Sequence, residues 1–358
     1  MKHYFLFILL SAAIATGGCT EELQPQTGGT NGTVPDESEL TEAVLNLSVN
    51  AFVVEAQAET RASIPSGTPE KETPEEKEIH NIWVFQYDAA TKELLIKPRY
   101  YTITDQAMLQ DLPVYLKAGV PSVVYVVTNT GYDNWANDGT DASWQKFKQL
   151  EQLKKQTLPT AFPLRSIDKV SIPMAGASEE VEVTTGITVT VPVTRMYAKL
   201  KVKVEMRKAE MELNNVNVRQ IPNICRVETL AGDGKGEPME PVPFPDETTF
   251  SSIAFAASDL EKNEDKEWAV FYVPENLQGE TQTQGGNKSD AAPSNALVVD
   301  ITTEIGGERY LYAAYPGGNS LNNFNIQRNQ VYRITVTITG EKNQNNPSAN
   351  CFVVKPDG

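Results

Sequence analysis

Histidine is nearly absent from this chain of 358 residues, which contains only His3 and His80. A zinc site built from several histidines is therefore excluded, and the H-E-x-x-H, G-x-S-x-G and P-loop motifs are absent as well. The glycine-rich residues 232–236 lack the spacing of a phosphate-binding loop and indicate a hairpin loop. The 47 acidic residues leave room for a pair of catalytic carboxylates, but no pair stands out. We therefore expect no enzyme and no cofactor.

Acidic and amide side chains cluster around Gly139, and such a cluster can indicate a calcium-binding loop. An EF-hand numbered back from this glycine would place Asn134, Ala136 and Asp138 at the first three ligand positions and Gln145 at the twelfth. Ala136 cannot bind a cation. The pattern favours a solvated loop without a metal.

Basic residues and cysteines are also scarce. Lys plus Arg is 31 against 47 for Asp plus Glu, so the net charge is −16 and a nucleic-acid-binding surface is not indicated. The three cysteines are Cys19, Cys225 and Cys351. The last two could form one disulfide or remain buried free thiols.

No apolar run reaches the roughly 20 residues that span a bilayer. The run from Tyr4 to Ala15 follows Lys2 and ends in small residues, which is typical of a signal peptide over residues 1–18. Gly17, Gly18 and Cys19 resemble a bacterial lipobox, which implies a diacylated Cys19 as the new N-terminus and attachment to the outer membrane. An ordinary signal peptide is the alternative.

One strand is isolated between two segments of low hydrophobicity, residues 20–38 and the Pro- and Glu-rich residues 64–78. Within it, apolar residues alternate with mostly polar ones, which predicts a half-buried strand over residues 44–54. The residues expected to share its buried face are Leu45, Leu47, Val49, Ala51 and Val53. A lone strand is unstable, so this one must join a sheet elsewhere in the molecule.

From Ile79 onward, short strands alternate with turns, which predicts an all-β chain of two tandem β-sandwiches, residues 62–194 and 195–358. One short helix is expected in the first domain, because Trp144, Phe147, Leu150 and Leu153 recur every three residues after Ser143. We expect this helix to pack as a lid over the end of a sandwich.

Five short motifs occur in order over the second half of the chain. They are Ile172–Pro173–Met174–Ala175–Gly176; Arg195 with Ala198 and Lys199; Phe271 to Gly279; Tyr315–Pro316–Gly317 followed by Arg328, Asn329 and Tyr332; and Asn350–Cys351–Phe352–Val353. Together they resemble the fimbrillins, the major and accessory pilins of Bacteroidetes, which have transthyretin-like sandwich domains. Each motif read alone is made of turn and core residues of a β-sandwich.

The resemblance implies a mechanism of assembly. Fimbrillins are exported as lipoproteins and cut after an arginine by a trypsin-like protease, and a C-terminal strand of a neighbouring subunit then fills the vacated groove. Here the cut would fall between Arg61 and Ala62, releasing residues 19–61 with the strand. The donor would be Phe352, Val353 and Val354, or the longer segment from Val331 to Thr339 released with them.

The resemblance therefore predicts a surface fimbrial subunit that supports adhesion, with other subunits, the outer membrane and a protease as partners. Two alternatives stay open. One is an uncut anchor or tip subunit, and the other is a surface lipoprotein that binds glycans. A glycan binder would be expected to expose an aromatic platform, whereas Trp83 and Trp268 fit core positions.

Overall fold

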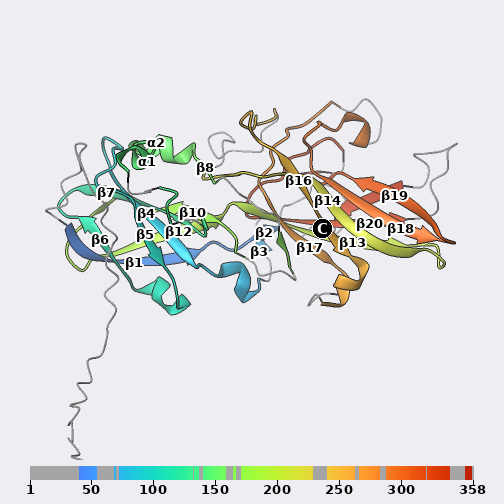
Figure 1. Cartoon of the computed structure of the whole chain (residues 1–358), viewed down its shortest axis with the longest axis horizontal. Helices are drawn as coiled ribbons and strands as arrows, with labels where there is room; N and C mark the ends of the chain where they lie inside the picture. The colour runs from blue at the N-terminus through green and yellow to red at the C-terminus, as the bar shows by residue number, and fades with distance from the viewer. Residues whose placement is uncertain are drawn as a thin grey trace, which may run out of the picture.

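The chain folds into two β-rich domains that lie end to end (Figure 1). The computed structural model describes residues 40–54, 68–69, 72–131, 133–136, 140–158, 164–166, 171–228, 240–262, 266–282, 288–319, 321–338 and 351–356. The predicted all-β class is confirmed. Within the described residues, no helix is long and apolar enough to cross a bilayer.

An eight-stranded sheet forms the N-terminal domain, in the order β5-β4-β7-β10-β12-β1-β6, with β11 also paired to β7. Its strands are β1 (Leu40–Val49), β4 (Asn81–Asp88), β5 (Arg99–Thr102), β6 (Leu112–Lys117), β7 (Pro121–Thr128), β10 (Met174–Ala177), β11 (Val181–Glu182) and β12 (Thr188–Arg195). Both halves of this sheet contribute to one hydrophobic cluster, so the sheet curls over its own core. Val84 of β4 lies in that cluster and its neighbours Trp83 and Phe85 lie in another, as expected for a strand buried on both faces.

Two sheets packed face to face form the C-terminal domain. The larger follows the order β3-β2-β20-β13-β17-β9, with β21 also paired to β20, and the smaller follows β16-β14-β18-β19. The larger sheet contains β2 (Val53–Val54), β3 (Thr68–Pro69), β9 (Leu164–Arg165), β13 (Tyr197–Met206), β17 (Ala269–Pro274), β20 (Gln330–Ile338) and β21 (Cys351–Pro356). The smaller contains β14 (Glu212–Pro222), β16 (Phe250–Ala256), β18 (Val298–Ile305) and β19 (Glu308–Ala314). Their inner faces share one core, to which Leu200, Val216 and Ile301 contribute.

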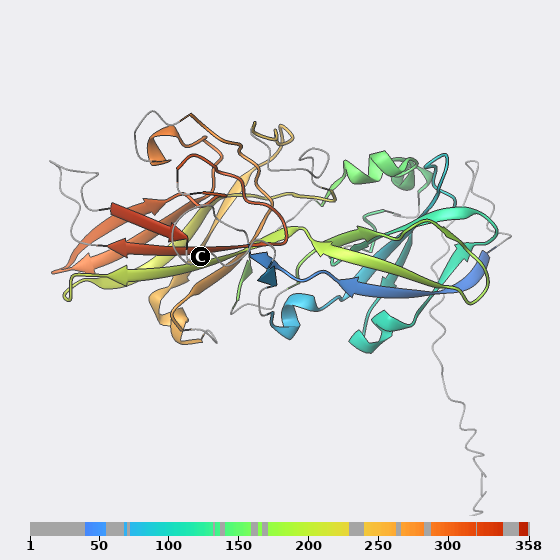
Figure 2. The ribbon, with the colours of Figure 1, turned by 180° about the vertical axis from the view of Figure 1, so that it is seen from behind.

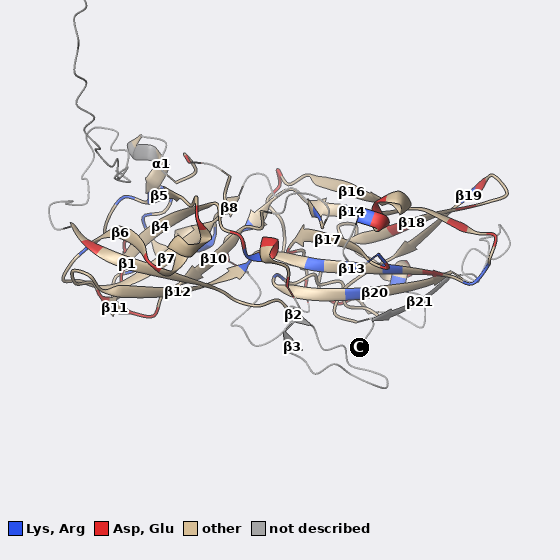
Figure 3. Ribbon diagram, turned by 90° about the horizontal axis from the view of Figure 1, so that it is seen from below, with Lys and Arg blue, Asp and Glu red and all other residues tan. Residues whose placement is uncertain are grey.

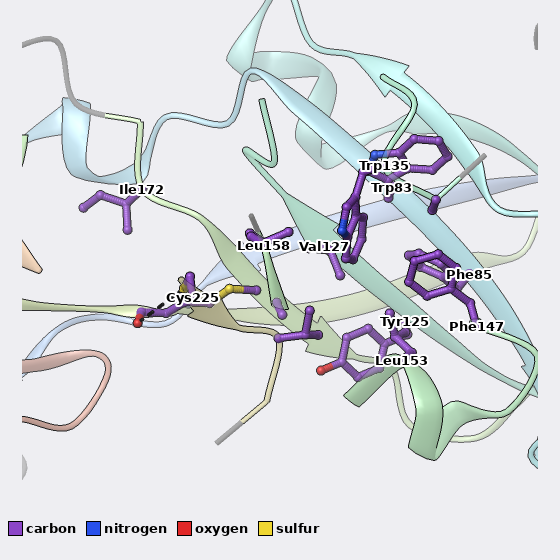
Figure 4. Packing of buried hydrophobic residues seen from close by; sticks show 14 of the residues in the cluster. Trp83, Phe85, Tyr125, Val127, Trp135, Phe147, Leu153, Leu158, Ile172 and Cys225 are labelled. Atoms are coloured by element: carbon purple, nitrogen blue, oxygen red, sulfur yellow. Dashed lines mark hydrogen bonds between the residues drawn. The ribbon is translucent and has the colours of Figure 1, made fainter. Parts of the chain in front are cut away.

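The helical lid is split in two, where the sequence predicts one helix. α1 (Asp141–Gln145) and α2 (Leu150–Lys154) are separated because Lys148 and Gln149 pair with the chain at Glu93 and Leu94. Trp144, Phe147, Leu150 and Leu153 are buried in one cluster with side chains from one face of β4 and β7, and Figure 4 shows Phe147 and Leu153 there.

Short elements complete the fold. β8 (Thr157–Leu158) pairs with β15 (Cys225–Arg226), and in the described residues 3₁₀ helices cover Pro74–Lys77, Gln106–Gln110, Ala257–Lys262 and Lys288–Ala291. Cys225 is buried as a free thiol, and burial raises its pKa to about 12. Of the two states left open for this cysteine, the structure shows the free one.

Gly176 explains one of the sequence motifs in structural terms. A Cβ atom at this position would lie 1.8 Å from the carbonyl oxygen of Pro192, because β10 and β12 approach closely beyond their paired residues. Only glycine fits there without moving the backbone. This motif residue therefore serves the packing of the N-terminal sheet.

Candidate functional site

β1 is an interior strand of the N-terminal sheet. The sequence predicted that this isolated strand would join a sheet elsewhere in the molecule, and it does. It pairs in parallel with β12, from Val44 opposite Thr188 to Val49 opposite Val193. On its other side it pairs antiparallel with β6, from Leu40 opposite Lys117 to Leu45 opposite Leu112. Among the described strands, β6 has no other neighbour in the sheet, so β1 joins it to β12.

The side chains of β1 alternate between core and surface. Ala43 and Leu45 are fully buried and Leu47 is 3% exposed, all within the core shared with β6 and β12. Val49 is partly buried against the same core. The predicted strand therefore exists and carries Leu45, Leu47 and Val49 on its buried face.

The predicted alternation fails after Asn50. β1 ends at Val49, and the chain passes to the C-terminal sheet, where Val53 and Val54 form β2 beside the start of β20 (Figure 2). Phe52 is fully buried and Ala51 is only partly buried, which reverses the predicted faces. The side chain of Val53 lies outside what the structure describes. The reversal arises because one continuous stretch of sequence serves two sheets, and the pleat starts anew in the second.

A group of buried polar residues surrounds Phe52 where the two domains meet. We call it the junction cluster, and it consists of Glu72, Glu76, Arg195, Lys199, Tyr272 and Asn329. Figure 3 shows basic and acidic segments together in this region. Arg195 ends β12, Lys199 lies on β13, Tyr272 lies on β17, and Asn329 precedes β20.

Arg195 is the centre of the junction cluster and is fully buried. Its Nη1 atom lies 2.9 Å from Oε1 of Glu72 and donates to the carbonyl oxygen of Asn50 at 2.6 Å. Its Nε atom donates to the carbonyl oxygen of Glu76 at 2.9 Å. The guanidinium lies 4.2 Å from the ring centroid of Phe52, within the range of a cation–π contact. Its Nη2 atom is buried and has no hydrogen-bond partner among the described residues.

Glu76 anchors the other half of the cluster. Lys199 Nζ lies 2.7 Å from Oε1 of Glu76, and the Tyr272 hydroxyl donates to the same oxygen at 2.6 Å. Its Oε2 atom accepts from the backbone N–H of Thr73 at 2.9 Å. The carboxylate is thus shared between a cation, a phenol and the start of a 3₁₀ helix, as buried charges require.

The pKa values in the cluster follow from these contacts. Burial opposes ionisation of Glu72, but hydrogen bonds from Lys77 and from the backbone N–H of Phe52, with the charge of Arg195, hold its pKa below the ordinary value. Burial lowers the pKa of Arg195. Burial and the carboxylate of Glu76 raise the pKa of Tyr272, so the phenol stays protonated. With its pKa lowered, the Glu72 carboxyl is ionised at neutral pH beside the Arg195 guanidinium.

The cluster ties both sides of the predicted cleavage site to the same arginine. Asn50 and Phe52 precede that site, and Glu72 and Glu76 follow it, while β2 and β3 pair with each other across it. Residues 55–67, which join β2 to β3, contain Arg61 and Ala62. Cys19, Arg61 and Ala62 themselves lie outside the described residues.

The predicted donor segment lies in β21. Its backbone pairs antiparallel with β20 of the same chain, with Val336 opposite Val354 and Ile334 opposite Pro356. The side chains of Phe352, Val353 and Val354 lie outside what the structure describes. β20 itself is an interior strand paired to β13 along Lys199–Met206, with Tyr332, Ile334 and Val336 buried. The alternative in which residues 331–339 leave with the tail is therefore disfavoured.

Sequence reasoning missed Glu72 and Glu76, which it placed in a flexible Pro- and Glu-rich run. A local signal was present, because Thr73 and Glu76 have the spacing of a capping box and form one at the start of the 3₁₀ helix. Arg195, Lys199, Tyr272 and Asn329 belong to three of the five motifs, but nothing in the sequence showed that these motifs converge on one cluster.

Neither a metal site nor an exposed tryptophan is found in the described part of the chain. No group of three or more His, Cys, Asp and Glu residues there could hold a metal ion. Trp83, Trp135 and Trp144 are at most 7% exposed, and Trp268 is partly buried. The tryptophans therefore form no aromatic platform.

Comparisons with known proteins give distant likenesses. A family model described as Domain of unknown function (DUF4906) matches residues 271–336. No curated protein matches the chain. Similar solved structures include the tip fimbrial protein Mfa3 from Porphyromonas gingivalis, with 15% identity, a TM-score of 0.49, and coverage of 84% of this chain and 96% of that one.

Two further structures cover similar shares. A candidate cell adhesion protein from Bacteroides eggerthii has 16% identity and a TM-score of 0.47, with 92% of this chain and 93% of that chain covered. A fimbrial assembly protein from Parabacteroides distasonis has 16% identity and a TM-score of 0.44, with 84% and 91% covered. The chain is similar, at low sequence identity, to fimbrial and cell adhesion proteins of Bacteroidetes, the phylum whose fimbrillins its motifs resemble.

Proposed function

We propose that this chain is a structural subunit of a cell-surface fimbrium that supports adhesion, rather than an enzyme. In this proposal residues 1–18 direct export and Cys19 carries a lipid that holds the precursor at the outer membrane. A trypsin-like protease then cuts between Arg61 and Ala62. Residues 19–61 leave, and residues 62–194 and 195–358 remain as the two domains of the mature subunit.

The observation that carries the proposal is the position of β1. It lies between β12 and β6, so its loss would leave two strands with unpaired backbone groups and an apolar groove between them. Such a groove accepts a strand from another chain through backbone hydrogen bonds, with side chains filling alternate pockets. A subunit that has lost β1 is therefore expected to seek a donor strand.

Proteolysis is needed because β1 is firmly held. Full burial of a leucine such as Leu45 or Leu47 is worth about 1.5–3 kcal/mol, and backbone pairing on both edges adds to this. While β1 remains covalently attached, it rebinds from a high effective concentration. A cut within residues 55–67 abolishes that advantage, so a released strand diffuses away.

The donor in this proposal is the C-terminal segment that contains Phe352, Val353 and Val354. A contact between the tail of one subunit and the groove of the next is head-to-tail and does not close on itself, so it produces a filament. An uncut subunit would keep β1 and could anchor or cap such a filament. The glycan-binding alternative receives no support from the described tryptophans, which form no exposed platform.

The proposal can be tested by treating the purified chain with trypsin and separating the products by SDS gel electrophoresis without boiling. The wild-type chain is expected to give a ladder of polymers once residues up to Arg61 are removed. An Arg61→Gln variant is the matched control and should remain a monomer under limited digestion. Wild-type chain that is cut at Arg61 and stays monomeric would contradict the proposal.

A further inference from the structure

The tail of the chain repeats the sequence of the strand that it would replace. Residues 46–54 read Asn-Leu-Ser-Val-Asn-Ala-Phe-Val-Val, and residues 346–354 read Asn-Pro-Ser-Ala-Asn-Cys-Phe-Val-Val. Six of these nine positions are identical. Residues 340–345 are mostly polar and do not resemble residues 40–45, which include Leu40, Ala43, Val44 and Leu45, so the match covers only the end of the strand nearest the junction.

The identical positions include two whose side chains make contacts at or beside the junction cluster, Asn50 with Thr194 and Phe52 with Arg195. Asn50 donates from Nδ2 to Oγ1 of Thr194 at 2.8 Å. The ring of Phe52 lies over the guanidinium of Arg195. The backbone N–H of Phe52 donates to Oε1 of Glu72 at 2.8 Å. Asn350 and Phe352 would supply the same groups at the same spacing.

Three of the nine positions differ between the two segments. Ala51 contributes its carbonyl oxygen, which accepts from Nδ2 of Asn329 at 2.7 Å, and Cys351 offers the same carbonyl. Pro347 would take the place of the buried Leu47, with a smaller side chain and no N–H. The N–H groups of Val44 and Asn50 donate toward β12, so by alternation the N–H at position 47 faces the β6 side, where pairing ends at Leu45. Ala349 in place of Val49 is smaller and fits without strain.

An empty junction cluster would be costly. Loss of Asn50 and Phe52 removes from Arg195 a carbonyl acceptor and its aromatic cover, while its Nη2 atom already lacks a partner among the described residues. Buried charges that lose partners are strongly destabilising. The site therefore favours an occupant that restores both groups.

We propose that the junction cluster is a socket that receives residues 346–354 of a second copy of this chain, in the register that residues 46–54 hold before cleavage. This inference rests on the proposed function and specifies the site, partner and alignment of its strand exchange. Phe352 is the anchor over Arg195, and Asn350 binds Thr194.

The same chain's tail cannot reach this register. β2 runs parallel to β20 with Val54 opposite Val331, so β20 continues toward Ile338 in the direction away from Asn46. Along extended strands this separates Ile338 from the Asn46 position by about 50 Å, at a rise of about 3.3 Å per residue. Residues 338–346 span at most about 29 Å when fully extended. The uncut chain instead pairs this tail antiparallel with its own β20. The occupant must therefore come from another copy.

A cross-link tests the register directly. Thr194→Cys and Asn350→Cys are combined with Cys351→Ala in the full chain, which is cut with trypsin and oxidised in air. Because Asn50 and Thr194 are in side-chain contact, the pair is expected to give a disulfide-linked ladder that survives boiling and collapses on reduction. The control combines Thr194→Cys with Ser348→Cys, two residues out of register, and is expected to give no ladder. The uncut double variant should also stay monomeric, because Asn50 still fills the site.

The outcomes separate this inference from the proposed function. Polymers without the cross-link, or cross-linking of the out-of-register pair, overturn the socket and leave strand exchange standing. A disulfide within one monomer overturns the second copy as the occupant. A wild-type chain that is cut but forms no polymer overturns both. As an independent check, Phe352→Ala should weaken assembly roughly a hundredfold, whereas Lys355→Ala should leave it within about twofold.

Discussion

Arg195 is the residue on which the junction between the domains depends. It is fully buried, and it contacts backbone carbonyls on both sides of the predicted cleavage site as well as the carboxylate of Glu72. Removing one partner of a buried ion pair is strongly destabilising, because it leaves an uncompensated buried charge. Substitution of Arg195 or of one of its partners is therefore expected to lower the stability of the chain strongly.

Replacing Arg195 with methionine should lower the free energy of unfolding by about 3–5 kcal/mol, because Glu72 would lose its buried cation. Urea denaturation monitored by tryptophan fluorescence would measure the change. Arg309→Met is the matched control, since Arg309 is largely exposed beside Glu304 and such pairs contribute about 0–1 kcal/mol. Equal effects of the two substitutions would contradict the role given to Arg195.

Glu72 should make stability depend on pH in the acidic range. Its pKa is lower in the folded chain than the ordinary value of 4.5, so the unfolded chain binds the proton more readily. The stabilisation is fully present above pH 4.5 and is lost as the pH falls through the lower folded-state value. The melting temperature of wild type should fall more steeply below that pH than that of Glu72→Gln. Parallel curves would argue against an ionised Glu72 in the cluster.

At the scale of elements, the sequence predicted strands well wherever one strand serves one sheet. Alternation located β1 and β20, and a continuous apolar run located β4. Alternation failed between Asn50 and Phe52, where the chain changes sheets, and nothing local signals such a change. The helical lid was predicted as one piece because its pairing with Glu93 is non-local.

The same distinction explains the candidate site. Glu76 lies 119 residues from Arg195 and 196 residues from Tyr272, so no local pattern could bring them together. A Pro- and Glu-rich composition is typical of flexible segments, so residues 64–78 were predicted to be flexible despite the capping-box spacing at Thr73. The distant basic and aromatic partners are what bury these carboxylates.

Substitutions in β1 should lower the stability of the chain only where they fall on its buried face. Leu45→Ala is expected to cost about 2–5 kcal/mol in the uncut chain, because it leaves a cavity in the core shared by β6 and β12. Ser48→Ala, on the exposed face of the same strand, should change stability by less than about 0.5 kcal/mol. Urea denaturation of both variants gives the comparison. A Leu45 effect as small as that of Ser48 would mean that β1 is not inserted in solution.

Gly176→Ala should disturb the approach of β10 to β12. The added Cβ would meet Pro192 O at 1.8 Å, so the strands must separate at a cost of about 1–3 kcal/mol or more. Ala177→Ser, on the adjacent partly buried position, is the control and should be mild. Thermal unfolding would reveal the difference, and an unaffected Gly176→Ala variant would show that the backbone yields there.

At the scale of the whole molecule, the two domains are linked by a segment that contributes one strand to the sheet of each. β1 completes the N-terminal sheet and β2 adds to the C-terminal one, so residues 40–54 bridge both. Only residues 55–67 join this bridging segment to β3 and the remainder of the chain. A single cut in that connection would free the segment and open a groove along both domains.

In the proposed assembly, the mature subunit has lost this bridging segment. N-terminal sequencing and intact mass of SDS-resistant polymers isolated from the surface of expressing cells test it most directly. The account predicts chains that begin at Ala62 and contain no peptide from residues 40–54. Polymers built only from chains that keep an acylated Cys19 and an intact bond after Arg61 would contradict it.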